Sequence, residues 1–251
     1  MRELLYGLLV PAVRWFNRGV RTLAAATHLV QYKLEGALRP SAEWFDHQLD
    51  AQYQWPRLGR SGFVERGVLS ALALRPGGSV LELCCGDGFS TRHFYAPKAG
   101  RLIAVDANEE ALAHARTFNA ADNVTYERCD ITRSLPAGPF DNVVWDTAIH
   151  HFTRDTATEI LRRIAAVLTP EGTLSGHTVI EPGSRYVYQL QSFADAPDLA
   201  ELLATVFPHV CVRTTEDPLR TDLFFFAGFT AQALPFDPGR GDVTVIAREP
   251  S

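Results

Sequence analysis

From residue 79 onward, short apolar runs alternate with segments whose apolar residues recur every three or four positions. The runs have the length and composition of buried strands, and the segments between them are typical of amphipathic helices. The predicted strands are residues 79–84, 101–106, 124–129, 140–146 and 172–180, and the predicted helices are 88–95, 108–119 and 156–168. Strands that alternate with helices at this spacing predict a parallel sheet covered by helices on both faces.

The last third of the chain follows a different pattern. A helix is predicted over residues 197–207, and two strands, 209–214 and 222–229, are joined by only a short link. A short link favours an antiparallel hairpin, because parallel strands need a long crossover. Residues 243–247 have the composition of one further strand. The whole pattern predicts the α/β class, with a mostly parallel sheet that ends in an antiparallel hairpin.

Three helices are predicted ahead of the first strand, over residues 1–37, 41–54 and 61–74. The third is expected to bury an apolar face made of Phe63, Val64, Val68 and Leu72. We therefore expect a helical extension or lid over residues 1–60 and a main domain over residues 61–251. The first helix mixes apolar residues with arginines and has few acids. It is either an interfacial helix on an anionic membrane or a partner, or a cap whose basic face is solvated.

Composition narrows the function. The chain has 251 residues, a net charge of −5 and 46% hydrophobic residues, which is enough for a sizeable core. An acidic balance argues against a nucleic-acid partner, since such proteins usually carry a basic excess. The four cysteines, Cys84, Cys85, Cys129 and Cys211, lack the spacing of a zinc site or a disulfide framework. We therefore expect a cytoplasmic protein, with peripheral membrane contact through residues 1–37 left open.

A glycine-rich turn follows the first predicted strand. Gly86-Asp87-Gly88 lets the backbone bend sharply and lets a ligand come close to it. A dinucleotide site usually has a small residue where this chain has Thr91, which weakens the prediction of a pyrophosphate. Asp106 ends the second strand, where an acid can accept both hydrogen bonds of a ribose diol. That acid suits NAD and S-adenosylmethionine equally, so both ligands remain open on these residues.

An ordered series of motifs resembles that of class I S-adenosylmethionine-dependent methyltransferases. The series runs Glu82-x-x-x-Gly86-x-Gly88, Asp106, Cys129-Asp130-Ile131, Asp141-Asn-Val-Val-Trp145 and Leu168-Thr-Pro-Glu-Gly172. The resemblance covers about residues 60–230, judged by motif order and spacing. It implies a Rossmann-like, seven-stranded sheet, S-adenosylmethionine as cofactor and S-adenosylhomocysteine as product.

The same resemblance implies a role for each matching residue. The amino-acid and ribose part of the cofactor would be lined from the first strand and its turn, by Glu82, Cys84, Gly86 and Gly88, with Asp87 assisting. Asp106 would hold the ribose hydroxyls, with Ala107 against the adenine. Asp130 would accept from the adenine amino group, and Ile131 would pack on the ring. Asp146 would flank the methyl-bearing sulfonium, and Tyr53 or Arg60 would reach the methionine carboxylate.

Candidates for proton transfer lie just after the strand that ends at Asp146. His151 is the first candidate for a general base or acceptor-orienting group, and His150 is the second, because imidazole titrates near neutrality. The alternative is that both histidines only pack under the lid. No metal site is predicted, and His177 is interpreted as a pocket-lining or structural residue.

The leading hypothesis is therefore methyl transfer to a small-molecule acceptor, through O-methylation of a sugar, lipid-linked or secondary-metabolite hydroxyl. An NAD-dependent oxidoreductase and a non-catalytic, membrane-associated nucleoside-binding module are the alternatives. The sequence does not predict the oligomeric state.

Overall fold

The structure is a computed structural model that describes residues 2–37, 62–180, 190–217, 220–231, 234–236 and 242–247. The chain divides into two compact units, Met1–Ser61 and Gly62–Ser251. The described part of the first unit is a single long helix, α1 (Arg2–Ala37), as the sequence predicts. The predicted helix over residues 41–54 lies outside the described residues.

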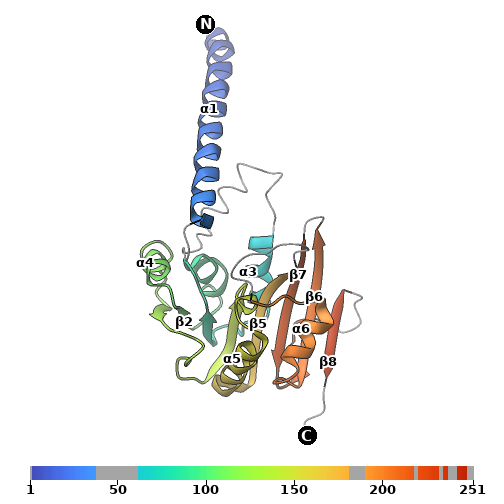
Figure 1. The fold of residues 1–251 in the computed structure, drawn as a ribbon. Coiled ribbons are helices and arrows are strands. Elements are labelled where there is room, and N and C mark those ends of the chain that lie inside the picture. The colour runs from blue at the N-terminus through green and yellow to red at the C-terminus, as the bar shows by residue number, and fades with distance from the viewer. Residues whose placement is uncertain are drawn as a thin grey trace. The chain divides into compact units, whose positions relative to one another are not determined.

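The second unit is built on one eight-stranded sheet with the strand order β3-β2-β1-β4-β5-β7-β6-β8 (Figure 1). The strands are β1 (Ser79–Leu83), β2 (Arg101–Asp106), β3 (Val124–Arg128), β4 (Phe140–Asp146), β5 (Leu168–Ile180), β6 (His209–Asp217), β7 (Arg220–Gly228) and β8 (Val243–Ala247). The first five strands pair in parallel, and β7, β6 and β8 continue the sheet in antiparallel pairs. The predicted class and the antiparallel end are confirmed.

The sheet has one strand more than the seven that the resemblance implies, and it is the further strand suggested over residues 243–247. Residues 243–247 form β8, which pairs with β6 from His209↔Ala247 to Arg213↔Val243. An antiparallel strand can join an edge without a long crossover, and Val243, Val245 and Ile246 supply the β-branched residues that favour it. The sheet is therefore extended beyond the hairpin by one short strand.

Helices cover both faces of the sheet. One face packs under α5 (Arg154–Val167) and α6 (Ala196–Leu203), and α6 lies over β6. The other face packs under α3 (Gly62–Leu72), η1 (Thr91–Tyr95) and α4 (Glu109–Phe118). Alternation along β7 separates the two cores, since Phe225 joins the first while Phe224 and Phe226 face the other side. All three phenylalanines are fully buried, as the sequence predicts for a hairpin strand.

The predicted buried face of α3 is wrong in its described part. Val68 and Leu72 are 45% and 48% exposed, whereas Arg66, Leu69 and Ser70 are buried. Arg66 and Ser70 lie one helical turn apart and turn toward polar groups at the end of β4. Those polar contacts, rather than apolar periodicity, set the orientation of the helix. The side chains of Phe63 and Val64 lie outside the described residues.

Helix α5 begins earlier than expected. Thr156 and Glu159 have the spacing of a capping box, but the N-cap is Thr153, whose side chain accepts from the Thr156 backbone N–H. Glu159 instead pairs with Arg162 on the helix surface. Thr153 is also a good capping residue, and it starts the helix closer to β4.

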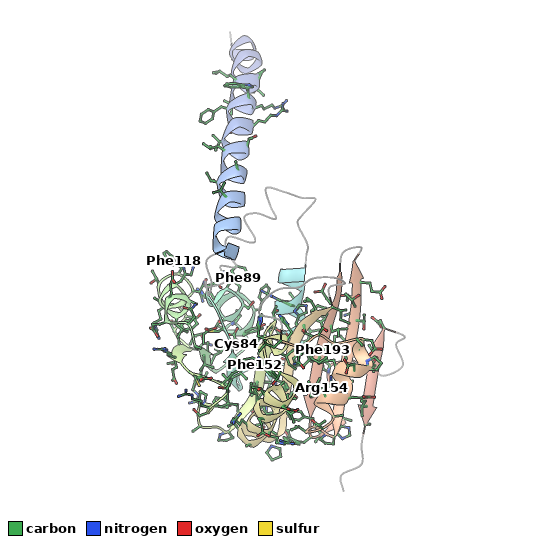
Figure 2. All side chains as sticks on the ribbon, viewed as in Figure 1. Cys84, Phe89, Phe118, Phe152, Arg154 and Phe193 are labelled. Carbon is green, nitrogen blue, oxygen red and sulfur yellow. The ribbon has the colours of Figure 1, made fainter. Side chains whose placement is uncertain are left out.

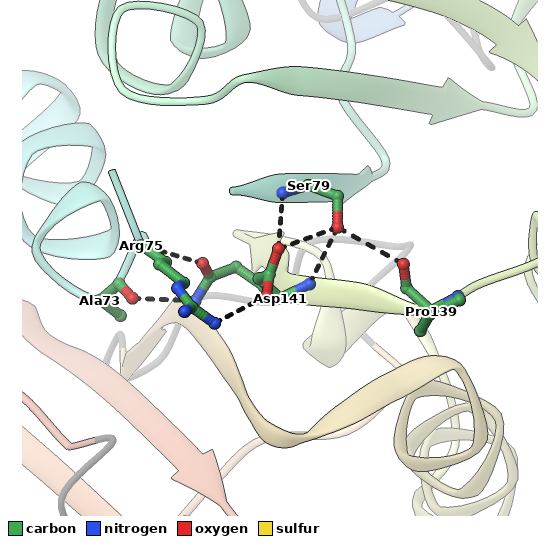
Figure 3. Close-up of polar contacts among 6 residues, drawn as sticks. Ala73, Arg75, Ser79, Pro139 and Asp141 are labelled. Carbon is green, nitrogen blue, oxygen red and sulfur yellow. Dashed lines mark hydrogen bonds and ion pairs between the residues drawn. The ribbon is translucent and has the colours of Figure 1, made fainter. Parts of the chain in front are cut away.

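A polar network joins α3 to β1 and β4 at the amino-terminal edge of the parallel strands (Figure 3). Asp141 accepts from the Ser79 backbone N–H at 2.8 Å and pairs with Arg75 at 3.3 Å. The Ser79 N–H is the main reason that the pKa of Asp141 is lowered. Asn142 accepts from the Arg75 N–H and donates to Ala73 O, both at 2.8 Å. These bonds fix the end of α3, and a cavity of about 480 Å³ lies at the same edge.

Candidate functional site

The site lies where β1 and β4 run side by side in parallel while the chain leaves them toward opposite ends of the sheet. In open α/β sheets, ligands bind at such a switch point, outside the carboxyl ends of the strands. Cys84 follows β1 and Thr147 follows β4, and both have positive φ values, 57° and 52° (Cys84 is labelled in Figure 2). Non-glycine residues pay a conformational cost there, and such residues cluster at functional sites.

The glycine-rich turn is held by the second strand. Gly86 and Gly88 have φ values of 56° and 77°, and the Gly86 N–H donates to Asp106 Oδ2 at 2.9 Å. The other Asp106 oxygen accepts from the Asn108 N–H at 2.8 Å. A Cβ atom on Gly88 would lie 2.6 Å from the Tyr126 hydroxyl, so a larger residue does not fit this turn. Asp106 therefore organises the backbone around the predicted ribose position.

Glu82 is a buried carboxyl group within β1. Its Oε2 accepts from the Thr91 hydroxyl at 2.6 Å, and the residue is 3% exposed. Burial raises the pKa of Glu82 well above its ordinary value, and the nearby acids Asp146, Asp87 and Asp106 raise it further. A cation bound at this edge would stabilise the ionised form.

Asp146 ends β4 and is bound by two hydroxyl groups. Ser70 of α3 donates to Oδ1 at 2.7 Å, and Tyr95 of η1 donates to Oδ2. Burial raises the pKa of Asp146, against the opposing effects of the Tyr95 hydrogen bond and the Arg66 charge. Thr91 and Tyr95 both belong to η1, a π-helical turn, so one short helix serves the two carboxyl groups.

A chain of buried polar contacts runs from α3 to β7. The Arg66 guanidinium donates to Thr147 Oγ1 at 2.7 Å, and that oxygen lies 2.9 Å from His177 Nδ1. His177 Nε2 lies 2.8 Å from Asp222 Oδ1. Burial lowers the pKa of His177, although Asp222 acts in the opposite direction. A neutral ring that donates from Nε2 to Asp222 and accepts at Nδ1 from Thr147 satisfies every contact in this chain.

The sequence interpretation did not identify Arg66, Ser70, Thr147 or Asp222 as site residues. One signal was present in the sequence, because His177 and Asp222 are ionisable residues within predicted strands, where buried polar groups need partners. Arg66 and Ser70 are four residues apart, which places both on one side of a helix. Their partners lie 76 to 81 positions later in the chain, so only the fold reveals the contacts.

The two candidate histidines occupy different environments in η2 (Ile149–His151). His150 is 4% exposed, and its Nδ1 lies 3.0 Å from the Thr178 hydroxyl. Burial, followed by the neighbouring His151 and His177, lowers the pKa of His150 to about 3. His151 is half-buried, and its ring centroid lies 4.3 Å from that of His150. His151 is therefore the more accessible of the two groups.

The residues predicted near the adenine also differ in exposure. Asp130 is exposed, and its Oδ1 accepts from the Thr132 hydroxyl at 2.6 Å and from the Thr132 N–H at 3.0 Å. These bonds lower the pKa of Asp130. Ile131 is buried and Ala107 is exposed. Tyr53 and Arg60 lie outside the described residues.

The acidic side chains at this edge of the sheet favour a cationic ligand. Glu82, Asp106 and Asp146 come from three neighbouring parallel strands, and their mutual repulsion contributes to the raised pKa of Glu82. A sulfonium and an α-amino group would relieve that repulsion, whereas a pyrophosphate would add to it. The described residues include no cluster of three or more side chains suited to a metal ion.

Comparisons with known proteins agree with this chemistry. Residues 80–172 match the family described as a methyltransferase domain. An uncharacterized methyltransferase of Mycobacterium tuberculosis is 36% identical over 107 residues, which cover 42% of this chain and 53% of that protein. A cyclopropane mycolic acid synthase of the same species is 28% identical over 119 residues, 45% of this chain and 40% of its own length. The chain thus spans about half the length of the curated relatives it matches.

A solved structure similar to this chain contains S-adenosylhomocysteine. The N-methyltransferase NodS of Bradyrhizobium japonicum, in complex with S-adenosylhomocysteine, aligns with a TM-score of 0.53 at 17% identity. The alignment covers 68% of this chain and 87% of that protein. At this identity the likeness is one of fold.

Proposed function

Residues 80–172 form a class I methyltransferase domain, and from this premise we propose that the chain transfers the methyl group of S-adenosylmethionine to a small-molecule acceptor. The observation that carries the proposal is the acidic edge formed by Glu82, Asp106 and Asp146. These acids suit a cationic cofactor, and the ligand in the NodS complex supports the choice of S-adenosylmethionine. S-adenosylhomocysteine is then the product.

The cofactor would be held from three strands. Glu82, Cys84 and the turn Gly86-Asp87-Gly88 would line its amino-acid and ribose parts, with Tyr53 at the carboxylate. Asp106 and Ala107 would hold the ribose and adenine, and Asp130 and Ile131 would complete the adenine pocket. Asp146, fixed by Ser70 and Tyr95, would lie beside the sulfonium. When bound, the cofactor supplies an electrophilic methyl group.

The remaining chemistry falls to groups on the acceptor side. A hydroxyl acceptor must lose its proton as the new bond forms, and an accessible imidazole can take it near neutral pH. His151 is assigned this role, because His150 is buried against Thr178 and its pKa is lowered to about 3. The neutral His177, bonded to Thr147 and Asp222, orients the backbone just before η2 rather than accepting a proton.

We place the acceptor among sugar, lipid-linked or secondary-metabolite hydroxyls. The name of the mycolic acid synthase relative supports the lipid part of this assignment but not the hydroxyl, because a cyclopropane ring forms at carbon. A panel of such acceptors, assayed for release of S-adenosylhomocysteine, identifies the class. Turnover confined to amines would overturn the assignment to oxygen.

Calorimetric titration separates the proposed function from its main rival. The full-length protein is titrated with S-adenosylmethionine and, in a separate experiment, with NAD. We expect saturable binding of S-adenosylmethionine and none of NAD. Binding of NAD alone would replace the methyltransferase with an oxidoreductase.

A further inference from the structure

Helix α1 carries an apolar stripe that runs along most of its length. The stripe consists of Leu9, Val13, Phe16, Val20, Leu23 and Val30, which are 50% to 68% exposed. At 100° per residue these six side chains fall within an arc of about 100°. So narrow and continuous a stripe is the pattern of a helix that lies against an apolar surface.

The opposite side of α1 is basic. In the helix projection, Arg14 and Arg18 lie about 160° from Phe16. The sequence between Glu3 and Glu35 contains these arginines and Lys33 but no acidic residue. Trp15 is 78% exposed at the boundary between the two sides. Tryptophan at such a boundary is typical of a helix at a membrane–water interface.

We propose that α1 lies flat on an anionic lipid surface, with the stripe in the outer acyl region and the arginines among the headgroups. The described helices include none that is long and apolar enough to cross a membrane. An apolar stripe opposite a basic face binds such surfaces through burial and charge together. Lipid binding by α1 requires no methyl transfer, so the proposal stands apart from the function of the domain.

Charge decides between lipid and a second copy of the chain. From Leu9 to Leu23 the stripe residues are spaced alternately four and three apart, as in a coiled coil, and Val30 follows seven positions later. In coiled coils, charged residues beside the stripe usually form ion pairs between helices. Here the flanking residues include Ala12, Asn17, Gly19, Ala24 and Ala26, which supply no acid for the arginines. Pairing two copies through the stripe would leave the arginines on the outer sides without ion pairs, whereas anionic headgroups would neutralise them.

The test measures co-sedimentation of the full-length protein with vesicles of phosphatidylcholine, with and without phosphatidylglycerol. We expect binding to the anionic vesicles, weak binding to the neutral ones, and a decrease as salt is raised. Arg18→Gln should weaken binding to anionic vesicles about fivefold, the usual effect of one basic residue near such a surface.

Two substitutions of equal charge test the stripe itself. Phe16→Asp places an acid in the stripe and should weaken binding more than tenfold. Thr22→Asp adds the same charge about 120° away, outside the stripe, and should weaken binding much less. Leu23→Asp repeats the first substitution one heptad later. Helix content is compared by circular dichroism, so that unfolding of α1 is recognised.

Two results would overturn the proposal. In the first, Phe16→Asp and Thr22→Asp bind anionic vesicles equally. In the second, the protein ignores vesicles of both kinds but forms a dimer that Phe16→Asp dissociates in light scattering, which would assign the stripe to a second copy.

Discussion

Thr91 donates its hydroxyl proton to the buried carboxyl group of Glu82 across 2.6 Å. The bond joins η1 to β1, the two elements on either side of the glycine-rich turn. It opposes burial, which raises the pKa of Glu82. The conformation of the proposed cofactor site thus depends on a contact that lies entirely inside the domain.

Thr91→Val removes this donor without changing the shape of the side chain. We expect a loss of about 1–3 kcal/mol in the free energy of unfolding, since a buried acceptor loses its partner. A carboxyl group with a raised pKa contributes most stability below its unfolded-state value and loses it as pH rises through the folded value. The Thr91 hydrogen bond lowers the pKa of Glu82, so the substitution should raise that pKa further. The loss of unfolding free energy should therefore be larger at pH 8 than at pH 5 in urea melts. Thr117→Val, at an exposed site on α4, is the control, and an equal effect there would contradict the assignment.

Thr147→Val tests the buried chain between α3 and β7. The substitution keeps the β-branched shape and removes the oxygen that contacts both Arg66 and His177. We expect a destabilisation of about 1–3 kcal/mol in urea and reduced turnover. Thr158→Val, at an exposed position of α5, should change stability by less than about 0.5 kcal/mol. Normal stability and turnover in Thr147→Val would show that the contact has no role.

His150 should contribute to acid sensitivity. Its pKa is about 3 in the fold, whereas an unfolded histidine titrates near pH 6.5. The unfolded chain therefore binds the extra proton, and stability falls as pH decreases below about 6.5. His150→Gln should reduce the slope of unfolding free energy against pH by about 1.4 kcal/mol per unit between pH 5 and 6. Above pH 8 the two slopes should agree, and identical slopes at every pH would refute this account.

Asp106→Asn tests the ribose position. Loss of the charge should raise the dissociation constant for S-adenosylmethionine at least about tenfold in calorimetry, because hydrogen bonds to charged groups are the strong ones. Glu171→Gln provides a matched charge change, since this exposed residue lies at the start of β5, at the opposite edge. If Asp106→Asn left the affinity for S-adenosylmethionine unchanged, the ribose would have to bind elsewhere.

His151→Ala tests the proposed base. We expect turnover to fall about 100-fold or more while affinity for S-adenosylmethionine is kept. His114→Ala, on α4 beside Phe118, should leave turnover unchanged. Equal turnover in the unsubstituted protein, His151→Ala and His114→Ala would show that His151 only packs in the fold.

Most of the fold follows from the sequence because its dominant signal is simple. The alternation of apolar runs and amphipathic segments predicts the parallel strands and the antiparallel end, and the structure confirms both. The orientation of α3 is the clearest failure. Val68 and Leu72 have the right periodicity for a buried face, yet Arg66 and Ser70 are buried instead. Their hydrogen-bond partners lie on β4 and just after it, so the orientation is a tertiary effect.

In the candidate site, too, some residues could be located from the sequence and others could not. The acids at or near the ends of β1, β2 and β4 can be located from sequence, because strand ends at a switch point lie together. The groups that hold them cannot be located so easily. Thr91 was noted only as a poor match to a dinucleotide motif, and the structure gives it a partner in Glu82. Tyr95 likewise looks like a core aromatic residue until its hydroxyl is found on Asp146.

The strand order also bears on how the domain folds. The antiparallel strands β6 and β7 are joined by a short link, so this hairpin can form early and locally. The pairing of β1 with β4 brings together residues as distant in the chain as Val80 and Asn142, which costs more loop-closure entropy. We expect this junction to be among the last to form. The cofactor edge would then be completed late in folding, and the nascent chain would gain affinity for its cofactor only when the sheet is nearly whole.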